Sequence, residues 1–296
     1  MCLNAGKHTL LEKPFACTVE EAEKLIQFAK EKQVFLMEGM WTRFFPAVEQ
    51  ARKLVQQDGA LGQVVAVFSD FNFNASDSEE YPTSFVYNRQ LGGGASLLTG
   101  PYPIAAATLF YPGMQPDQIK VVGQVDASTG VDLQACISLS FPPTSDVSPA
   151  MNADKESHER TPKLPGAGVA NLSYGLLCES VEETTVVGTK GRLVIQSPAH
   201  CPTRLVVTLK GNGRGAAADE FVYDYPLPAD TPTITAAGGY YYPNSAGFCY
   251  EAAAVARCIA AGRSEAPQYT LAETLVGMQI LEQARLQLGV KAVSEA

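Results

Sequence analysis

The sequence of 296 residues lacks several features that mark particular classes of protein. Its three histidines, His8, His158 and His200, lie far apart and form no HxxxH or HExxH spacing, so no metal site is predicted. No apolar run approaches the roughly 18 residues that span a bilayer, and the first residues do not resemble a signal peptide. The net charge of -9 argues against nucleic acid or an anionic membrane as a partner.

The seven cysteines are scattered, with no CxxC and no paired spacing. Several of them lie in apolar runs, which is typical of reduced core residues in a reducing compartment. We therefore expect a cytoplasmic protein. The composition, 46% hydrophobic and 18% charged, is that of an ordinary globular chain of one or two domains.

A glycine-rich phosphate loop is also missing. A dinucleotide-binding domain normally begins with a strand, a GxGxxG turn and a helix, whose backbone N–H groups bind the pyrophosphate. The glycines at 92–94 follow a polar loop, and those at 211–215 join two strand-like runs, so both clusters are predicted to be turns. We therefore expect that the first part of such a domain is absent.

Residues 8–45 are predicted to form a strand, a helix and a second strand. A capping box begins the helix at 18–32, and apolar runs at 9–11 and 35–37 flank it. This is the pattern of a parallel βαβ unit, which needs both faces covered. Without upstream strands, one edge of the unit is expected to be unpaired.

Lys13 lies where the first of these strands ends, between Glu12 and Pro14. A lysine beside a glutamate is usually only a solvated ion pair. Here, however, residues 40–46, with the sequence MWTRFFP, follow the end of the second strand and add an arginine and three aromatic rings. Ligands bind at the carboxyl edge of open α/β sheets, so these two strand ends favour a ligand site.

From residue 64 the apolar period changes to two, which predicts a second domain built on strands. We expect strands at 64–73, 119–125, 131–141, 170–176, 184–195 (a hairpin), 205–209 and 221–225, and helices at 46–57, 247–261 and 271–288. Together they predict a large, mostly antiparallel sheet with one polar face. The Pro- and Ser-rich segment 142–168 is predicted to be a disordered insertion.

Two motifs, GKHTLLEKP at 6–14 and FLMEGMWTRFFP at 35–46, resemble those of the Gfo/Idh/MocA oxidoreductases. Within that family they are most similar to the dimeric dihydrodiol dehydrogenases and the D-xylose dehydrogenases. The resemblance implies an α/β plus α+β fold. A C-terminal remnant of a Rossmann domain would occupy 1–45, and an open-faced, mostly antiparallel sheet domain with helices on one face would occupy 46–296.

The resemblance also implies an NADP- or NAD-dependent oxidoreductase that removes hydride from a secondary alcohol, diol or sugar. Glu12, Lys13 and Pro14 would lie beside the cofactor, and the lysine–proline peptide is typically cis in this family. Lys13 would polarise the substrate hydroxyl, and Tyr102 would act as acid and base. The open face of the sheet would be buried in a homodimer.

Trp41, Arg43 and Phe71 are the candidate substrate-binding residues. Each has a simpler interpretation, because aromatic residues are usually core residues and an arginine is by default an exposed cation. Tyr102 also has a simpler interpretation, as a tyrosine that merely packs in an apolar helix. If Tyr102 is catalytic, the positive charge of Lys13 is expected to favour its phenolate form.

Leu98 departs from the family pattern, which places an aspartate at this position. A leucine side chain neither orients a hydroxyl nor holds a lysine by charge, so we expect impaired catalysis. Two alternatives stay open. The chain is a cofactor-free remnant that acts as a binding or dimerisation module, or its sequence begins at an internal methionine of a longer protein.

Overall fold

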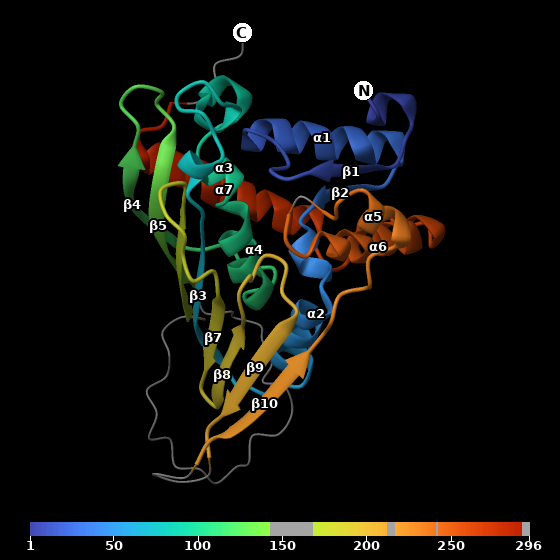
Figure 1. Cartoon of the computed structure of the whole chain (residues 1–296), viewed down its shortest axis with the longest axis vertical. Helices are drawn as coiled ribbons and strands as arrows, with labels where there is room; N and C mark the ends of the chain where they lie inside the picture. Colours follow the sequence, from blue (N-terminus) through green and yellow to red (C-terminus); the bar gives the residue numbers. More distant parts are fainter. Residues whose placement is uncertain (143–167, 212–216, 241, 292–296) are drawn as a thin grey trace.

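The computed structural model describes residues 1–142, 168–211, 217–240 and 242–291. Nearly all of the predicted insertion at 142–168, and most of the glycine cluster at 211–215, lie outside the described residues. In Figure 1 a small N-terminal unit stands beside a large, twisted sheet, and the last long helix crosses between the two.

The N-terminal unit is the predicted βαβ arrangement. Strands β1 (Thr9–Glu12) and β2 (Leu36–Gly39) pair in parallel, with α1 (Val19–Lys32) between them in sequence. The predicted capping box of α1 is present, because the Thr18 hydroxyl accepts from the Glu21 N–H and the Glu21 carboxylate accepts from Thr18. Among the described residues, β1 has no strand on its other side.

The large sheet has eight strands in the order β10-β9-β8-β7-β3-β6-β5-β4. Their bounds are β3 Val64–Asn72, β4 Gln118–Val125, β5 Asp132–Phe141, β6 Gly168–Gly175, β7 Thr184–Gly188, β8 Gly191–Ile195, β9 Arg204–Leu209 and β10 Asp219–Asp224. Only β3 and β6 pair in parallel. The prediction of a mostly antiparallel sheet is therefore confirmed.

The remaining helices are α2 Pro46–Arg52, α3 Ala95–Leu98, α4 Pro101–Phe110, α5 Pro232–Ala236, α6 Phe248–Ala260 and α7 Leu271–Leu288. A π-helical turn at Lys53–Gln57 continues α2, so the predicted helices at 46–57, 247–261 and 271–288 are confirmed within a residue. Helices α3, α4 and α7 cover one face of the sheet, and the main core fills the space between them. On the other face, the side chains of Phe68, Val122 and Val169 are exposed.

The two C-terminal helices hold the N-terminal unit in place. The Val19 N–H donates to Glu282 of α7 at 3.2 Å, and Met278 joins the apolar core under α1. Ala254 and Cys258 of α6 pack against Phe35 in a third, smaller apolar cluster. Both contacts fix the carboxyl edge of β1 and β2 so that it faces the start of α4.

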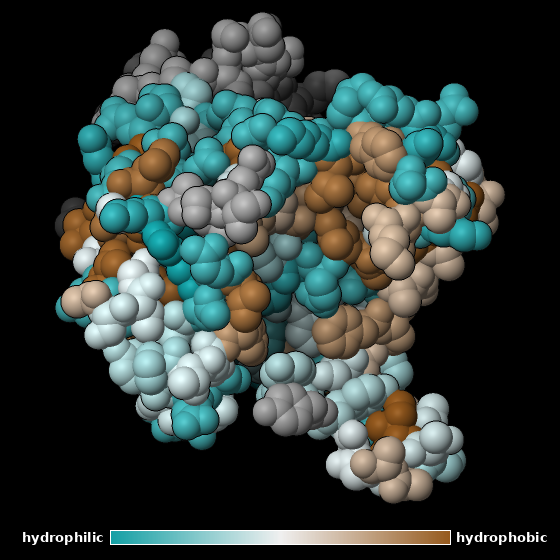
Figure 2. All heavy atoms as spheres, turned by 90° about the horizontal axis from the view of Figure 1, so that it is seen from above, coloured by the Kyte–Doolittle hydropathy of each residue, from teal (hydrophilic) through white to brown (hydrophobic). Residues whose placement is uncertain are grey.

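The end of the molecule that carries α1 has a mixed surface. Figure 2 looks down on this end and shows hydrophobic patches among mostly hydrophilic residues. Leu10 of β1 is one exposed apolar side chain in this unit. No helix in the described part of the chain is long and apolar enough to cross a membrane.

Candidate active site

Lys13 projects from the carboxyl end of β1 toward the break between α3 and α4. Its Nζ donates to the Leu98 carbonyl oxygen at 2.7 Å and lies 4.7 Å from the centre of the Tyr102 ring. The two residues predicted to be catalytic are therefore neighbours, although 89 positions separate them in sequence. The Lys13–Pro14 peptide is cis.

The amine of Lys13 is largely withdrawn from water. Burial lowers its pKa to about 8, and the charges of Glu12 and Glu38 act in the opposite direction. The amine therefore exchanges its proton close to neutral pH, as an acid or base in catalysis must.

Leu98 holds this lysine through its backbone rather than its side chain. It is the last residue of α3, where the helix carbonyls have no intrahelical partner and point toward the end of the helix. The carbonyl accepts from the ammonium, but it carries no full charge. Leu98 thus positions Lys13 without supplying the carboxylate expected at this position.

The glycine loop before α3 brings Leu98 to this place. Gly94 has a φ of 110° and lies against Asp132, whose carboxylate accepts from both the N–H and the hydroxyl of Ser96 at 2.7 and 2.9 Å. A Cβ at Gly94 would approach the carboxylate to 2.6 Å. A larger residue at 94 is therefore excluded, and Asp132 fixes the start of α3.

The ionisation of Tyr102 differs from the expectation. Burial raises the pKa of its hydroxyl above the ordinary range, and a hydrogen bond with the Trp41 side chain opposes this only partly. The expectation of a favoured phenolate is wrong, because the Lys13 ammonium lies over the ring face while burial penalises the phenolate. Tyr102 is therefore a proton donor in its resting form.

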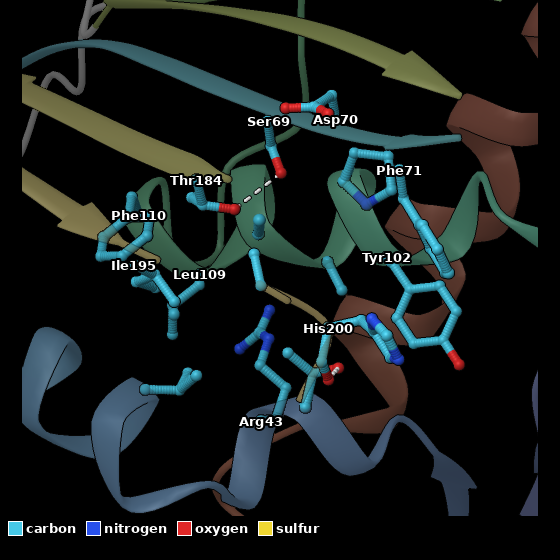
Figure 3. Close-up of a pocket in the computed structure, with 16 residues that line it drawn as sticks. Arg43, Ser69, Asp70, Phe71, Tyr102, Leu109, Phe110, Thr184, Ile195 and His200 are labelled. Carbon is cyan, nitrogen blue, oxygen red and sulfur yellow. Dashed lines mark hydrogen bonds between the residues drawn. The ribbon is translucent and has the colours of Figure 1, made fainter. Parts of the chain in front are cut away.

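Five aromatic side chains, counting His200, form a cluster that includes Tyr102, the ring beside Lys13. The Tyr102 ring packs edge-on against Phe71 at 5.0 Å, and Phe71 stacks on His200 at 4.7 Å with 7° between the planes. Trp41 stacks on Phe248 of α6 at 4.1 Å. Figure 3 shows Phe71, Tyr102 and His200 side by side, at one end of a small cavity.

That cavity lies between α4, β3 and the start of α2. Its free volume is about 20 Å³, enough for a water molecule but not for a sugar. Arg43, Phe71 and Tyr102 line it, and Trp41 does not.

Arg43 is not the exposed cation that its simpler interpretation predicts. Only 3% of it is exposed, and its guanidinium donates to Glu273, Thr108 and the Gln268 carbonyl at 2.9–3.1 Å. It also lies 4.7 Å from the centre of the Tyr269 ring. Because all these partners belong to α4, α7 and the segment before α7, Arg43 joins those elements within the core.

A histidine–carboxylate pair lies in the same cluster and was missed by the sequence reasoning. The His200 Nδ1 hydrogen-bonds the Glu182 carboxylate, and the Asp70 carboxylate accepts from the backbone N–H groups of Glu182 and Glu183 at 2.7 and 3.2 Å. The pairing of β3 with β7 brings Asp70 to Glu182, and the β7–β8 hairpin returns the chain so that His200 meets Glu182. No spacing rule would have found them.

Two buried glutamates at this edge were also missed. Glu38 accepts from the Phe15 N–H at 3.1 Å and from the Thr274 hydroxyl at 2.9 Å, and burial raises its pKa to about 7. Glu251 of α6 has one carboxyl oxygen without a partner. The described residues contain no group of three His, Cys, Asp or Glu side chains placed to hold a metal.

Of the residues assigned to the cofactor, Glu12 is exposed and accepts from the Lys13 backbone N–H at 2.8 Å. Glu12, Lys13 and Pro14 lie together at the carboxyl ends of β1 and β2, which is where nicotinamide cofactors bind in open α/β sheets. The Lys13 amine and the Tyr102 phenol are groups that hydrogen-bond an amide or a hydroxyl. The residues present therefore fit the nicotinamide end of such a cofactor.

Comparison with known families and proteins agrees with this geometry. Residues 1–40 match the family described as the oxidoreductase family with an NAD-binding Rossmann fold, and residues 48–194 match the GFO/IDH/MocA C-terminal domain. The chain is 31% identical over 290 residues to trans-1,2-dihydrobenzene-1,2-diol dehydrogenase of Sus scrofa, covering 98% of this chain and 73% of that protein. It is 30% identical to D-xylose 1-dehydrogenase (NADP(+)) of Hypocrea jecorina, covering 98% and 69%.

Solved structures show the same fold. An aldose–aldose oxidoreductase from Caulobacter crescentus, complexed with glycerol, superposes with a TM-score of 0.71 at 24% identity, covering 97% of this chain and 72% of that one. A 3-ketoreductase from Actinomadura kijaniata, in complex with NADP and TDP-benzene, gives a TM-score of 0.67 at 21% identity, covering 96% and 72%. The two family matches and the relatives of 30–31% identity establish that the chain belongs to the Gfo/Idh/MocA family of oxidoreductases.

Proposed function

We propose that the chain oxidises a secondary alcohol, diol or sugar with NADP as the hydride acceptor, using Lys13 and Tyr102. One observation carries this proposal, namely that the Lys13 amine lies between the Leu98 carbonyl and the Tyr102 ring at the carboxyl edge of β1 and β2. The names of the relatives, a dihydrodiol dehydrogenase and a D-xylose dehydrogenase, support the substrate class.

The proton steps follow from the ionisation states of Lys13 and Tyr102. A bound NADP would supply the hydride acceptor for the substrate carbon, and the hydroxyl proton would pass to the protein. Lys13 has a pKa of about 8, so its neutral fraction accepts that proton. Tyr102 stays protonated at neutral pH and donates a hydrogen bond to the substrate oxygen as the carbonyl forms.

In this proposal Phe71 and Trp41 supply the apolar wall near the reacting carbon. Phe71 supports the ring of Tyr102 directly, and Trp41 hydrogen-bonds its hydroxyl. Arg43 contributes indirectly, since its contacts with α4 and α7 hold the start of α4, where Tyr102 lies.

The test is NADP⁺ reduction with D-xylose and with trans-dihydrobenzenediol as substrates. We expect activity from the chain, a loss of at least a hundredfold in Lys13→Met and a smaller loss in Tyr102→Phe. Equal rates in the parent and Lys13→Met chains would overturn the assignment of Lys13.

The second candidate is a binding or dimerisation module with impaired catalysis. Leu98 favours it, because Lys13 is held by a neutral carbonyl and not by a carboxylate. A parent chain that binds a polyol but reduces no NADP⁺ would favour this alternative.

We further propose that 1–45 is part of a dinucleotide-binding domain and that 46–296 is the sheet domain. The separate hydrogen bonding of the two sheets supports this division. The open face of the large sheet exposes Phe68, Val122 and Val169, which supports a homodimer formed through that face. All seven cysteines are free, in keeping with a reducing compartment such as the cytoplasm.

A further inference from the structure

Glu251 occupies an unusual position on α6. It shares one helix face with Phe248, Ala254 and Cys258, which are spaced three or four residues apart. Phe248 stacks on Trp41, while Ala254 and Cys258 pack with the residues of β2. Glu251 therefore lies between these two contacts, against the carboxyl end of β2.

The carboxyl group of Glu251 is buried without being satisfied. Only 4% of the residue is exposed, and its Oε2 has no hydrogen-bond partner. Burial raises its pKa to about 7, and the negative charge of Glu12 acts in the same direction. Glu251 lies one helical turn from Phe248, whose ring stacks on Trp41, and Trp41 hydrogen-bonds the hydroxyl of Tyr102. Since Lys13 lies over the Tyr102 ring, these contacts connect Glu251 with the Lys13 site.

Glu38 provides an internal comparison. It is also 4% exposed with a pKa near 7, but both of its oxygens have protein partners, on Phe15 and Thr274. The fold therefore supplies hydrogen-bond partners for both carboxyl oxygens of Glu38. Buried polar groups in native proteins are almost always hydrogen-bonded, so the free oxygen of Glu251 calls for a partner that is not part of this chain.

We propose that Glu251 is a ligand-binding residue of the Lys13 site, whose free oxygen accepts a hydrogen bond from a hydroxyl group of a bound polyol. This inference rests on the proposed function for the substrate class. Two molecules carry such a hydroxyl group, the substrate and the ribose of the cofactor. We assign the hydrogen bond with Glu251 to the substrate. Because the cavity near Tyr102 is too small for a sugar, we place the substrate outside it, beside Trp41 and Glu251.

The chain contains its own reporter for this site. Trp41 is the single tryptophan of the sequence and stacks on Phe248, one helical turn before Glu251. Its fluorescence therefore reports binding at this edge without any requirement for turnover. Titrations with D-xylose alone and with NADP⁺ alone separate the two sources of the hydroxyl.

We expect Glu251→Gln to weaken D-xylose binding about tenfold, which corresponds to about 1.4 kcal/mol, and to leave the affinity for NADP⁺ unchanged. Glu23→Gln, the same change at an exposed position of α1, is the matched control and should bind like the parent chain. The Tm of Glu251→Gln should equal or exceed that of the parent, whereas Glu38→Gln should have a lower Tm.

Three results would overturn the proposal. The first is that Glu251→Gln binds D-xylose as tightly as the parent chain does. The second is that Glu251→Gln lowers the Tm as much as Glu38→Gln does. The third is that the parent chain gives no saturable fluorescence change with D-xylose. Loss of NADP⁺ binding alone would assign the hydroxyl to the ribose and so reject the substrate assignment. D-xylose binding that depends on Glu251 without turnover would keep this proposal and reject the dehydrogenase.

Discussion

The Lys13 ammonium donates to the carbonyl oxygen of Leu98 at 2.7 Å, across 85 positions of sequence. This contact joins the end of β1 to the end of α3 and brings the amine over the ring of Tyr102. It also shows how the site is organised without a carboxylate at position 98, because the backbone of the residue there still holds the lysine.

Leu98→Asp should add the missing charge. A carboxylate beside the ammonium favours its charged form, so the pKa of Lys13 should rise, and the pH at which kcat/KM for D-xylose is half-maximal should rise with it, because the neutral amine forms only at higher pH. The measurement is steady-state NADP⁺ reduction across pH. Leu98→Asn, which is polar but uncharged, is the control. An equal effect of both variants would show that charge at position 98 does not limit catalysis.

The lowered pKa of Lys13 predicts how stability depends on pH. The folded chain has a value of about 8 and the unfolded chain one near 10.5, so the unfolded chain binds more protons between these limits. The contribution of Lys13 to stability should therefore rise as pH increases from about 8 to 10. Urea unfolding of the parent and of Lys13→Met at several pH values measures it. Two parallel stability curves would contradict the assignment.

Arg43→Met should destabilise the fold strongly. The change leaves Glu273 and Thr108 without their shared partner in the core, and breaking a buried ion pair in this way costs about 3–5 kcal/mol. Arg52→Met is the control, because the pair of Arg52 with Glu49 is partly exposed and is worth about 1 kcal/mol or less. Similar midpoints for the two variants in urea would refute the role of Arg43 in the core.

Phe68→Glu should disrupt the proposed homodimer. Phe68 is 45% exposed on the open face of the sheet, and a charge there opposes burial against a second copy. Analytical ultracentrifugation should give twice the chain mass of 31.6 kDa for the parent and the mass of one chain for the variant. Phe85→Glu, which alters an exposed phenylalanine outside the sheet, should remain dimeric. A monomeric parent chain would reject the dimer.

The sequence by itself determined the elements of this fold. Apolar spacing of two or of three to four residues located the strands and helices, and capping boxes marked the starts of α1 and α7. Such signals depend on interactions within a few residues, which the sequence displays directly. The resemblance to the family, and not a local signal, implied that Lys13 and Tyr102 share a site, and the two are neighbours in the structure.

Only the tertiary structure decided the environment of those residues. Arg43, a candidate for substrate binding whose simpler interpretation was an exposed cation, is buried in the core. The Tyr102 pKa moves in the opposite direction to the one expected from Lys13 alone. The His200–Glu182 pair and the free oxygen of Glu251 had no sequence signal at all. Burial and charge depend on contacts between elements that are distant in sequence, and desolvation by those contacts outweighs the local charges.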